Sequence, residues 1–271
     1  MNHTEKLIDV EKIIKSKNPS LLKWIPKFII SYLKKILHQE DINKFLVDNK
    51  DNYNQDFCIS VMKLLNAEVQ IKNIENIPKE GKIVLAMNHP LGGMDAMALV
   101  AALKSHREDL KFIVNDILLN LKNLNDIFLG VNKHGKNGLN LKQQLDQLFS
   151  SENCVCIFPA GLVSRKIDGK VKDLDWKKTF ITFSKVHGRT IIPIHIEGQL
   201  SPFFYRLSNF RKKIGIKANI EMLYLSNEFF KLKGKKITIT VGKAISADEL
   251  NEIKNDKKIA NNIKEKVYAL N

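Results

Sequence analysis

The amino-acid sequence predicts an α/β fold with a mixed, largely parallel sheet flanked by helices. Short apolar runs alternate with amphipathic stretches along residues 82–271. The run CVCIF is apolar at every position, which is typical of a strand buried on both faces. Histidine, lysine, proline and glycine gather directly after several of these runs. Because ligands of such sheets bind outside the carboxyl ends of the strands, we expect the functional site at this edge.

Length and composition fit one large α/β domain, alone or with a small appendage, because 271 residues with 44% hydrophobic residues can bury a sizeable core. The net charge is +15, which indicates an anionic partner such as nucleic acid, a lipid surface or an acidic carrier protein. Only three cysteines are present, at positions 58, 154 and 156, so we expect a reducing compartment and no disulfide framework. No further ligands at zinc spacing accompany them, and we expect no metal site.

Residues 1–56 are predicted to form an N-terminal helical segment, and residues 57–271 a second domain. In the stretch PSLLKWIPKFIISYLKKILHQ, apolar residues recur at helical spacing with lysines between them, and Pro26 begins or kinks the helix. Two interpretations stay open: this helix packs on the domain, or it lies in a membrane interface. Neither a signal peptide nor an apolar run of about 20 residues is visible, so we expect a cytoplasmic protein, peripheral on the inner face of the cell membrane.

From residue 82 onward, strands and helices are expected to alternate. Short apolar runs predict strands, and amphipathic periodicity between them predicts helices. The expected strands cover residues 82–88, 110–115, 126–132, 154–159, 190–198 and 235–242. The expected helices cover residues 95–103, 137–149, 174–186 and 247–270.

The stretch NHPLGGMD follows the first of these strands. A histidine can act as a general base near neutral pH, and a carboxylate on its far nitrogen fixes the tautomer and stabilises the imidazolium. Gly92 and Gly93 permit a tight turn that brings His89 and Asp95 together. The alternative is that Asp95 only caps the following helix.

The stretch GVNKHGKNG matches most of a phosphate-binding P-loop, with Gly130, Gly135 and Lys136 in place. Asn137 stands where the magnesium-holding hydroxyl would be, which argues against a nucleotide hydrolase. Lys133 and Lys136 stay candidates for holding a substrate anion. The sequence contains no G-x-S-x-G nucleophile elbow and no H-E-x-x-H zinc helix.

Four motifs in order, NHPLGGMD, FLGVNK, FPAGLVSRK and IIPIHIEG, resemble the glycerolipid acyltransferase superfamily, the PlsC-like enzymes. The resemblance runs from about residue 82 to residue 198 and continues more weakly to the end of the chain. It is closer to the hemolysin-like branch, which includes bacterial ornithine-lipid and glycine-lipid O-acyltransferases, and FFYRLSNFRKKIGIKANIEML is also similar to that branch. The superfamily's first motif has four residues between histidine and aspartate, whereas this chain has five. Lys133 replaces the arginine of the second motif, and Ala160 replaces the glutamate of the third.

The resemblance implies the glycerolipid acyltransferase fold and acyl transfer from an acyl thioester, either acyl carrier protein or coenzyme A, with no bound cofactor. His89 would be the general base and Asp95 its orienting partner. The acceptor would be the hydroxyl of a single-chain membrane lipid, most simply an amino-acid lyso-lipid, since the lost glutamate argues against glycerol phosphate. The alternative is a 1-acylglycerol-3-phosphate acyltransferase that makes phosphatidic acid. The expected substrate-binding residues are Asn88, Gly92, Gly93, Lys133, Ala160, Gly161, Ser164 and Arg165.

Residues 201–220 carry arginines and lysines with aromatic residues between them and no acidic residue. This pattern suits an anionic membrane surface or an acidic carrier protein, or simply a solvated basic helix over an aromatic core. Two rivals from other classes are a nucleic-acid-binding module and a non-catalytic lipid-binding protein. We expect no nucleic-acid partner, because no RRM, KH or zinc-finger signature is present. The basic residues are Arg206, Arg211, Lys212, Lys213 and Lys217, and the aromatic residues are Phe203, Phe204, Tyr205 and Phe210.

Overall fold

The computed structural model describes residues 8–115, 121–131 and 138–271. The chain forms two compact units. The helical unit combines Met1–Asn52 with Ser201–Leu232, and the sheet unit combines Tyr53–Leu200 with Lys233–Asn271. Residues 201–232 therefore group with the N-terminal segment, although they were expected within the domain that begins at residue 57.

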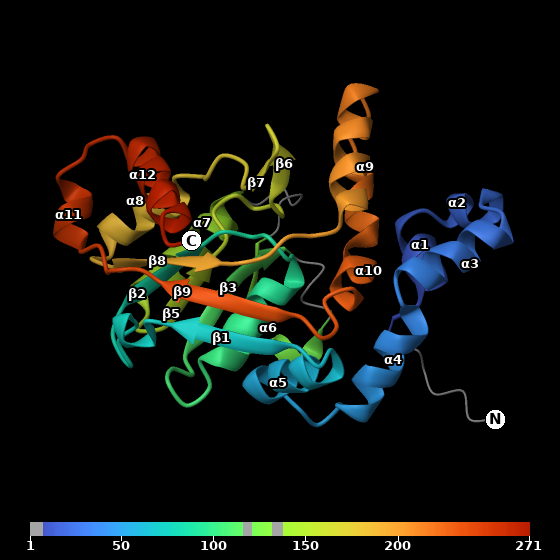
Figure 1. Cartoon of the computed structure of the whole chain (residues 1–271), viewed down its shortest axis with the longest axis horizontal. Helices are drawn as coiled ribbons and strands as arrows, with labels where there is room; N and C mark the ends of the chain where they lie inside the picture. The colour runs from blue at the N-terminus through green and yellow to red at the C-terminus, as the bar shows by residue number, and fades with distance from the viewer. Residues whose placement is uncertain (1–7, 116–120, 132–137) are drawn as a thin grey trace. The chain divides into compact units, whose positions relative to one another are not determined.

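The sheet unit is built on a seven-stranded sheet in the order β1-β9-β8-β2-β5-β3-β4 (Figure 1). β8, β2, β5, β3 and β4 are parallel to one another, whereas β9 runs antiparallel to β8 and parallel to β1. This arrangement confirms the predicted mixed, largely parallel sheet. The strands are β1 (Glu68–Lys72), β2 (Ile83–Met87), β3 (Leu110–Asn115), β4 (Phe128–Val131), β5 (Cys154–Ile157), β8 (Thr190–Ile196) and β9 (Lys236–Val241). A separate antiparallel hairpin joins β6 (Arg165–Ile167) to β7 (Lys170–Lys172).

Helices cover both faces of this sheet (Figure 1). Side chains alternate along a strand, so Val84 and Ala86 of β2 point to one face, where they join a core that contains Phe149, Phe180 and Ile263. The helices of that face are α7 (Gly138–Ser150), α8 (Thr179–Val186), α11 (Ala247–Asn251) and α12 (Asp256–Tyr268). The opposite face carries α5 (Asn54–Leu64) and α6 (Gly93–Ala102). Short 3-10 helices span Ile74–Asn76 and Lys122–Leu124.

The helical unit draws its helices from both of its chain segments. They are α1 (Val10–Lys17), α2 (Pro19–Trp24), α3 (Lys27–Ile36), α4 (Gln39–Asp48), α9 (Pro202–Lys213) and α10 (Leu225–Phe230), with the 3-10 helix η4 (Ile220–Tyr224). The hydroxyls of Tyr32 and Tyr224 lie 2.8 Å apart and join α3 to η4. Among the described residues, no helix is long and apolar enough to cross a membrane.

Three of the basic and aromatic side chains of residues 201–220 lie inside this unit. Arg211 is 6% exposed and pairs with buried Glu221 at 2.5 Å. Phe204 is fully buried, and Tyr205 nearly so. The interpretation of a solvated basic helix over an aromatic core therefore fits Phe204 and Tyr205, whereas Arg211 is buried and does not contribute to an exposed basic surface.

Pro26 divides the stretch of residues 19–39 into α2 and α3, as predicted, because proline lacks an N–H and disfavours a helical residue before it. Two other helix predictions were wrong in their extent. The helix expected at residue 174 begins only at Thr179. The closing helix of residues 247–270 is two helices, because Ser246 caps α11 with Glu249 and Asn255 starts a new N-cap for α12.

Candidate active site

His89 and Asp95 meet between the end of β2 and the first turn of α6. The Nδ1 atom of His89 lies 2.8 Å from Oδ2 of Asp95. The Asp95 carboxylate also accepts the backbone N–H of Leu91, at 3.0 Å to Oδ2. Asp95 is fully buried, whereas the imidazole is 17% exposed. A partly exposed imidazole is thus held by a fully buried carboxylate.

The two glycines form the turn that makes this contact possible. Gly92 has φ 69° and ψ −137°, a backbone conformation in which a β-carbon would be strained, and α6 begins at Gly93. The N–H of Asp95 donates to the carbonyl of Gly92, and the side chain turns back to His89 and Leu91. The Asp95 carboxylate thus hydrogen-bonds residues of the turn before the helix, His89 and Leu91. A residue that only caps the helix would not need the contact with His89.

Burial sets the electrostatics of the pair. Desolvation of the Asp95 carboxyl raises its pKa from an ordinary value of 3.8 to about 6, although the hydrogen bond and the charge of His89 pull the other way. The nearby charge of Asp173 raises the pKa of Asp95 further. A perturbed carboxyl of this kind next to a partly exposed histidine is typical of a functional site.

The imidazole is also held from the side by the loop after β5. The ring of His89 stacks on Phe158, with centroids 4.1 Å apart and an interplanar angle of 22°. The carbonyl of His89 accepts the N–H of Ser164 from the same loop at 2.8 Å. The motif that begins at Phe158 therefore lies against the His89 turn.

Asn88 uses its amide to join the ends of two strands. Its Nδ2 donates to the carbonyl of Ile196 at 2.9 Å, and its Oδ1 accepts the N–H of Ile196 at 2.7 Å. Gly198 follows on β8's exit, and a β-carbon there would lie 2.7 Å from Cδ2 of Leu91. The residues after β8 thus pack against the turn that follows β2. Asn88, which was predicted to bind substrate, hydrogen-bonds the end of β8.

The other predicted site residues lie in or near the same loop. Ala160 is buried, and Gly161 is exposed with φ 67°. Ser164 and Arg165 are each 1% exposed, and Nη1 of Arg165 donates to the carbonyl of Val163. Lys133 and Lys136 lie outside the described residues. Ligand contacts of all these residues stay predictions.

Asp173 was not predicted and lies against His89. Its Oδ1 accepts the backbone N–H of His89 at 3.2 Å and the hydroxyl of Ser164 at 2.5 Å. Trp176 donates its indole N–H to Oδ2 at 2.8 Å. The only sequence signal is an acidic residue before a tryptophan in VKDLDWKK, at a place where a helix start was expected.

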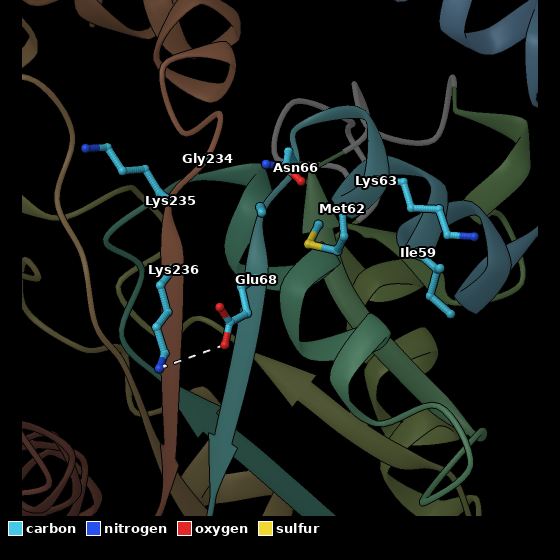
Figure 2. Close-up of a pocket in the computed structure, with 9 residues that line it drawn as sticks. Ile59, Met62, Lys63, Asn66, Glu68, Gly234, Lys235 and Lys236 are labelled. Carbon is cyan, nitrogen blue, oxygen red and sulfur yellow. Dashed lines mark ion pairs between the residues drawn. The ribbon is translucent and has the colours of Figure 1, made fainter.

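A pocket of about 500 Å³ lies at the starts of β1 and β9 (Figure 2). Because β9 runs antiparallel to β8, the start of β9 lies at the edge of the sheet where β8 ends. Lys236 pairs with Glu68 there at 3.9 Å, while Lys63 and Lys235 point away from one another. None of the predicted site residues lines this pocket. Within the part of the chain that the structure describes, no group of three or more His, Cys, Asp or Glu side chains is arranged to hold a metal ion.

Comparisons with known proteins agree with one another. A family model described as "Acyltransferase" matches residues 12–271. The chain is 44% identical over 265 residues to a protein of Bacteroides thetaiotaomicron named lyso-glycine lipid O-acyltransferase, covering 97% of each. A protein of the same name from Phocaeicola vulgatus is 43% identical, over 97% of this chain and 95% of that protein. A crystal structure of the 1-acyl-sn-glycerophosphate acyltransferase PlsC from Thermotoga maritima is similar in fold, with a TM-score of 0.51 and 18% identity over 79% of this chain and 75% of that one.

Proposed function

The chain belongs to the acyltransferase family, and on that premise we propose that it moves a fatty acyl group from an acyl thioester to the hydroxyl of a lyso-lipid of the glycine-lipid class. The observation that carries this proposal is the 44% identity to a lyso-glycine lipid O-acyltransferase across 97% of both chains. The likeness to the glycerophosphate enzyme is 18% and supports the fold alone. Ala160, where that branch has a glutamate, favours an acceptor other than a glycerol phosphate.

In the proposed mechanism, His89 is the general base. The carboxylate of Asp95 accepts a hydrogen bond from Nδ1–H, which keeps the proton of the neutral imidazole on Nδ1 and leaves Nε2 free to take a proton. The acceptor hydroxyl gives its proton to Nε2 as its oxygen attacks the thioester carbonyl. The tetrahedral intermediate then collapses, the C–S bond breaks, and the imidazolium returns the proton to the leaving thiolate. Asp95 stabilises the imidazolium between the two steps.

The negative oxygen of that intermediate needs hydrogen-bond donors. The first N–H groups of a helix have no partner within the helix, and the helix dipole favours negative charge there. α6 begins at Gly93, two residues before Asp95 in the chain, and a β-carbon at Gly93 would meet no atom within 4 Å. We therefore assign the oxyanion site to the start of α6.

Two acyl donors are compatible with this site, acyl carrier protein and coenzyme A. Both present the acyl group on a phosphopantetheine arm, and both are anionic, which suits a chain of net charge +15. The purified protein supplied with each acyl thioester in turn distinguishes the two.

The acceptor is tested by lipid analysis. We expect cells that lack the gene to lose a diacylated amino-acid lipid and to accumulate its single-chain form, because the last acylation is blocked. Mass spectrometry of lipid extracts measures both species, and the purified protein should acylate lyso-glycine lipid faster than 1-acylglycerol-3-phosphate. Loss of phosphatidic acid instead, with the amino-acid lipid unchanged, would assign the chain to the glycerophosphate reaction.

We further propose that the helical unit binds the surface of an anionic membrane. Trp24 is 82% exposed and Phe28 73% exposed, with Lys23 and Lys27 beside them. Phe210 on α9 is 59% exposed and is followed by the exposed Lys212 and Lys213. Exposed aromatic rings with interleaved lysines match an acyl boundary below anionic headgroups. Binding to the membrane surface would bring the protein to its lipid substrate.

A double substitution tests this surface. We expect Trp24→Ala with Phe28→Ala to lower binding to anionic liposomes by about tenfold or more, because each ring buried from water contributes ~1.5–3 kcal/mol. Cosedimentation measures the bound fraction. Val186→Ala is the matched control, since Val186 is an exposed apolar residue of the sheet unit. Equal binding by the double variant and the parent would contradict the proposal.

A further inference from the structure

We propose that Asp173 is a positioning residue, which fixes the backbone of His89 and so aims the imidazole at the acceptor hydroxyl. The inference rests on the proposed role of His89 as the base. Asp95 and Phe158 hold the ring of His89, but a ring can only be as well placed as the backbone that carries it.

The contacts of Asp173 and Ser164 form a closed ring around the His89 peptide groups. The N–H of His89 donates to Oδ1 of Asp173, and the hydroxyl of Ser164 donates to the same oxygen. The N–H of Ser164 in turn donates to the carbonyl of His89 at 2.8 Å. Both backbone polar groups of His89 are thus held by one pair of residues.

The chemistry of the site requires a carboxylate. Three donors converge on the Asp173 side chain, namely a backbone N–H, a hydroxyl and the indole N–H of Trp176. A carboxylate accepts on both oxygens, whereas an asparagine must present its NH₂ group to at least one of these donors. Asp173 is only 2% exposed, so water cannot relieve that mismatch.

The C-terminal helix holds Asp173 in turn. The N–H of Asp173 donates to the hydroxyl of Tyr268 at 2.7 Å, and Nζ of Lys264 donates to the carbonyl of Asp173 at 2.8 Å. Both side chains come from α12, which packs against the core of the sheet unit. The position of His89 is therefore linked through Asp173 to a helix more than 160 residues further along the chain.

The test is Asp173→Asn, measured beside Asp175→Asn. We expect Asp173→Asn to lower kcat by about 10- to 100-fold with the KM for each substrate changed less than about twofold, because a displaced base slows the chemical step. Asp175 is the matched control, since its side chain is 90% exposed and lies two residues away. Asp175→Asn should keep the parent's kcat.

A second variant separates positioning from general damage to the core. In Asp173→Asn with Trp176→Phe, the indole donor is absent, so the asparagine can keep its oxygen on His89 and turn its NH₂ group away. We expect the double variant to have about the same kcat as Trp176→Phe alone, because the carboxamide then faces no indole donor and the effects of the two substitutions do not add. A double variant slower than both single variants would overturn the proposal.

A readout other than activity makes the result independent of the proposed reaction. Hydrogen exchange at the His89 amide should quicken in Asp173→Asn by about tenfold or more, and remain as in the parent in Asp175→Asn. If His89→Ala kept the parental rate, the base would be wrong, yet this exchange would still report whether Asp173 holds the turn. Unchanged kcat together with unchanged exchange in Asp173→Asn would overturn the inference, and so would an equal loss in Asp175→Asn.

Discussion

We expect His89→Ala to lower kcat for acyl transfer by about 10³-fold or more, because the substitution removes the group that takes the hydroxyl proton. The loss should fall on kcat, since among the residues that the structure describes His89 is the side chain that hydrogen-bonds Asp95. The fold should persist, because the buried carboxylate of Asp95 still accepts the N–H of Leu91 and takes up a proton more readily. Transfer of a labelled acyl group to lyso-lipid, with circular dichroism as a check on folding, measures both effects.

The control for this variant is His187→Ala. His187 also contacts an aspartate, with Nε2 2.9 Å from Oδ1 of Asp146, but it lies at the end of α8. Its loss should leave kcat unchanged. Because His89 and Asp95 act as one unit, His89→Ala with Asp95→Asn should be no slower than His89→Ala alone. A turnover rate near that of the parent in His89→Ala would refute the general-base role.

The central strands were predictable from sequence because they are buried on both faces. β2 and β5 are apolar at every position, and β8 is apolar except at Thr190 and His195. Short apolar runs of this kind are typical of strands buried on both faces. β1 was missed, since EVQIK alternates polar and half-buried residues at the edge of the sheet. The hairpin of β6 and β7 was missed for a similar reason, because strands of three residues carry almost no periodicity.

The pairing of His89 with Asp95 was predictable because both residues lie on one turn. Their spacing of five intervening residues, one more than the related motif, is accommodated by the positive φ of Gly92. Asp173 could not be predicted in this way, since it is 84 residues from His89 and reaches it only through the packing of the sheet unit. Residue type was also a poor guide to exposure, because Ser164, Arg165 and Arg211 are all buried and hydrogen-bonded.

The electrostatics of Asp95 make stability and activity depend on pH in opposite ways. The folded protein holds the Asp95 proton with a pKa of about 6, against 3.8 for an ordinary aspartate, so it binds that proton more tightly than the unfolded chain does. The resulting stabilisation is complete below about pH 4 and is lost as the pH rises to about 6. Above that pH the ionised, buried carboxylate costs the fold about 3 kcal/mol. Catalysis needs the ionised form, so kcat should fall as the pH drops below about 6.

Asp95→Asn should therefore be a more stable protein at neutral pH and a nearly inactive one. An amide is neutral at every pH, so the gain in the free energy of unfolding over the parent should be larger at pH 7 than at pH 4, by about 2 to 3 kcal/mol. The amide NH₂ donates to Nδ1 of His89 and leaves the proton on Nε2, which should lower kcat by about 10³- to 10⁴-fold. Denaturant unfolding at the two pH values and acyl transfer at pH 7 measure the two effects. A variant less stable than the parent at pH 7 would contradict the claim that the ionised Asp95 carboxylate destabilises the fold. A variant that keeps its kcat would contradict the claim that this carboxylate orients His89.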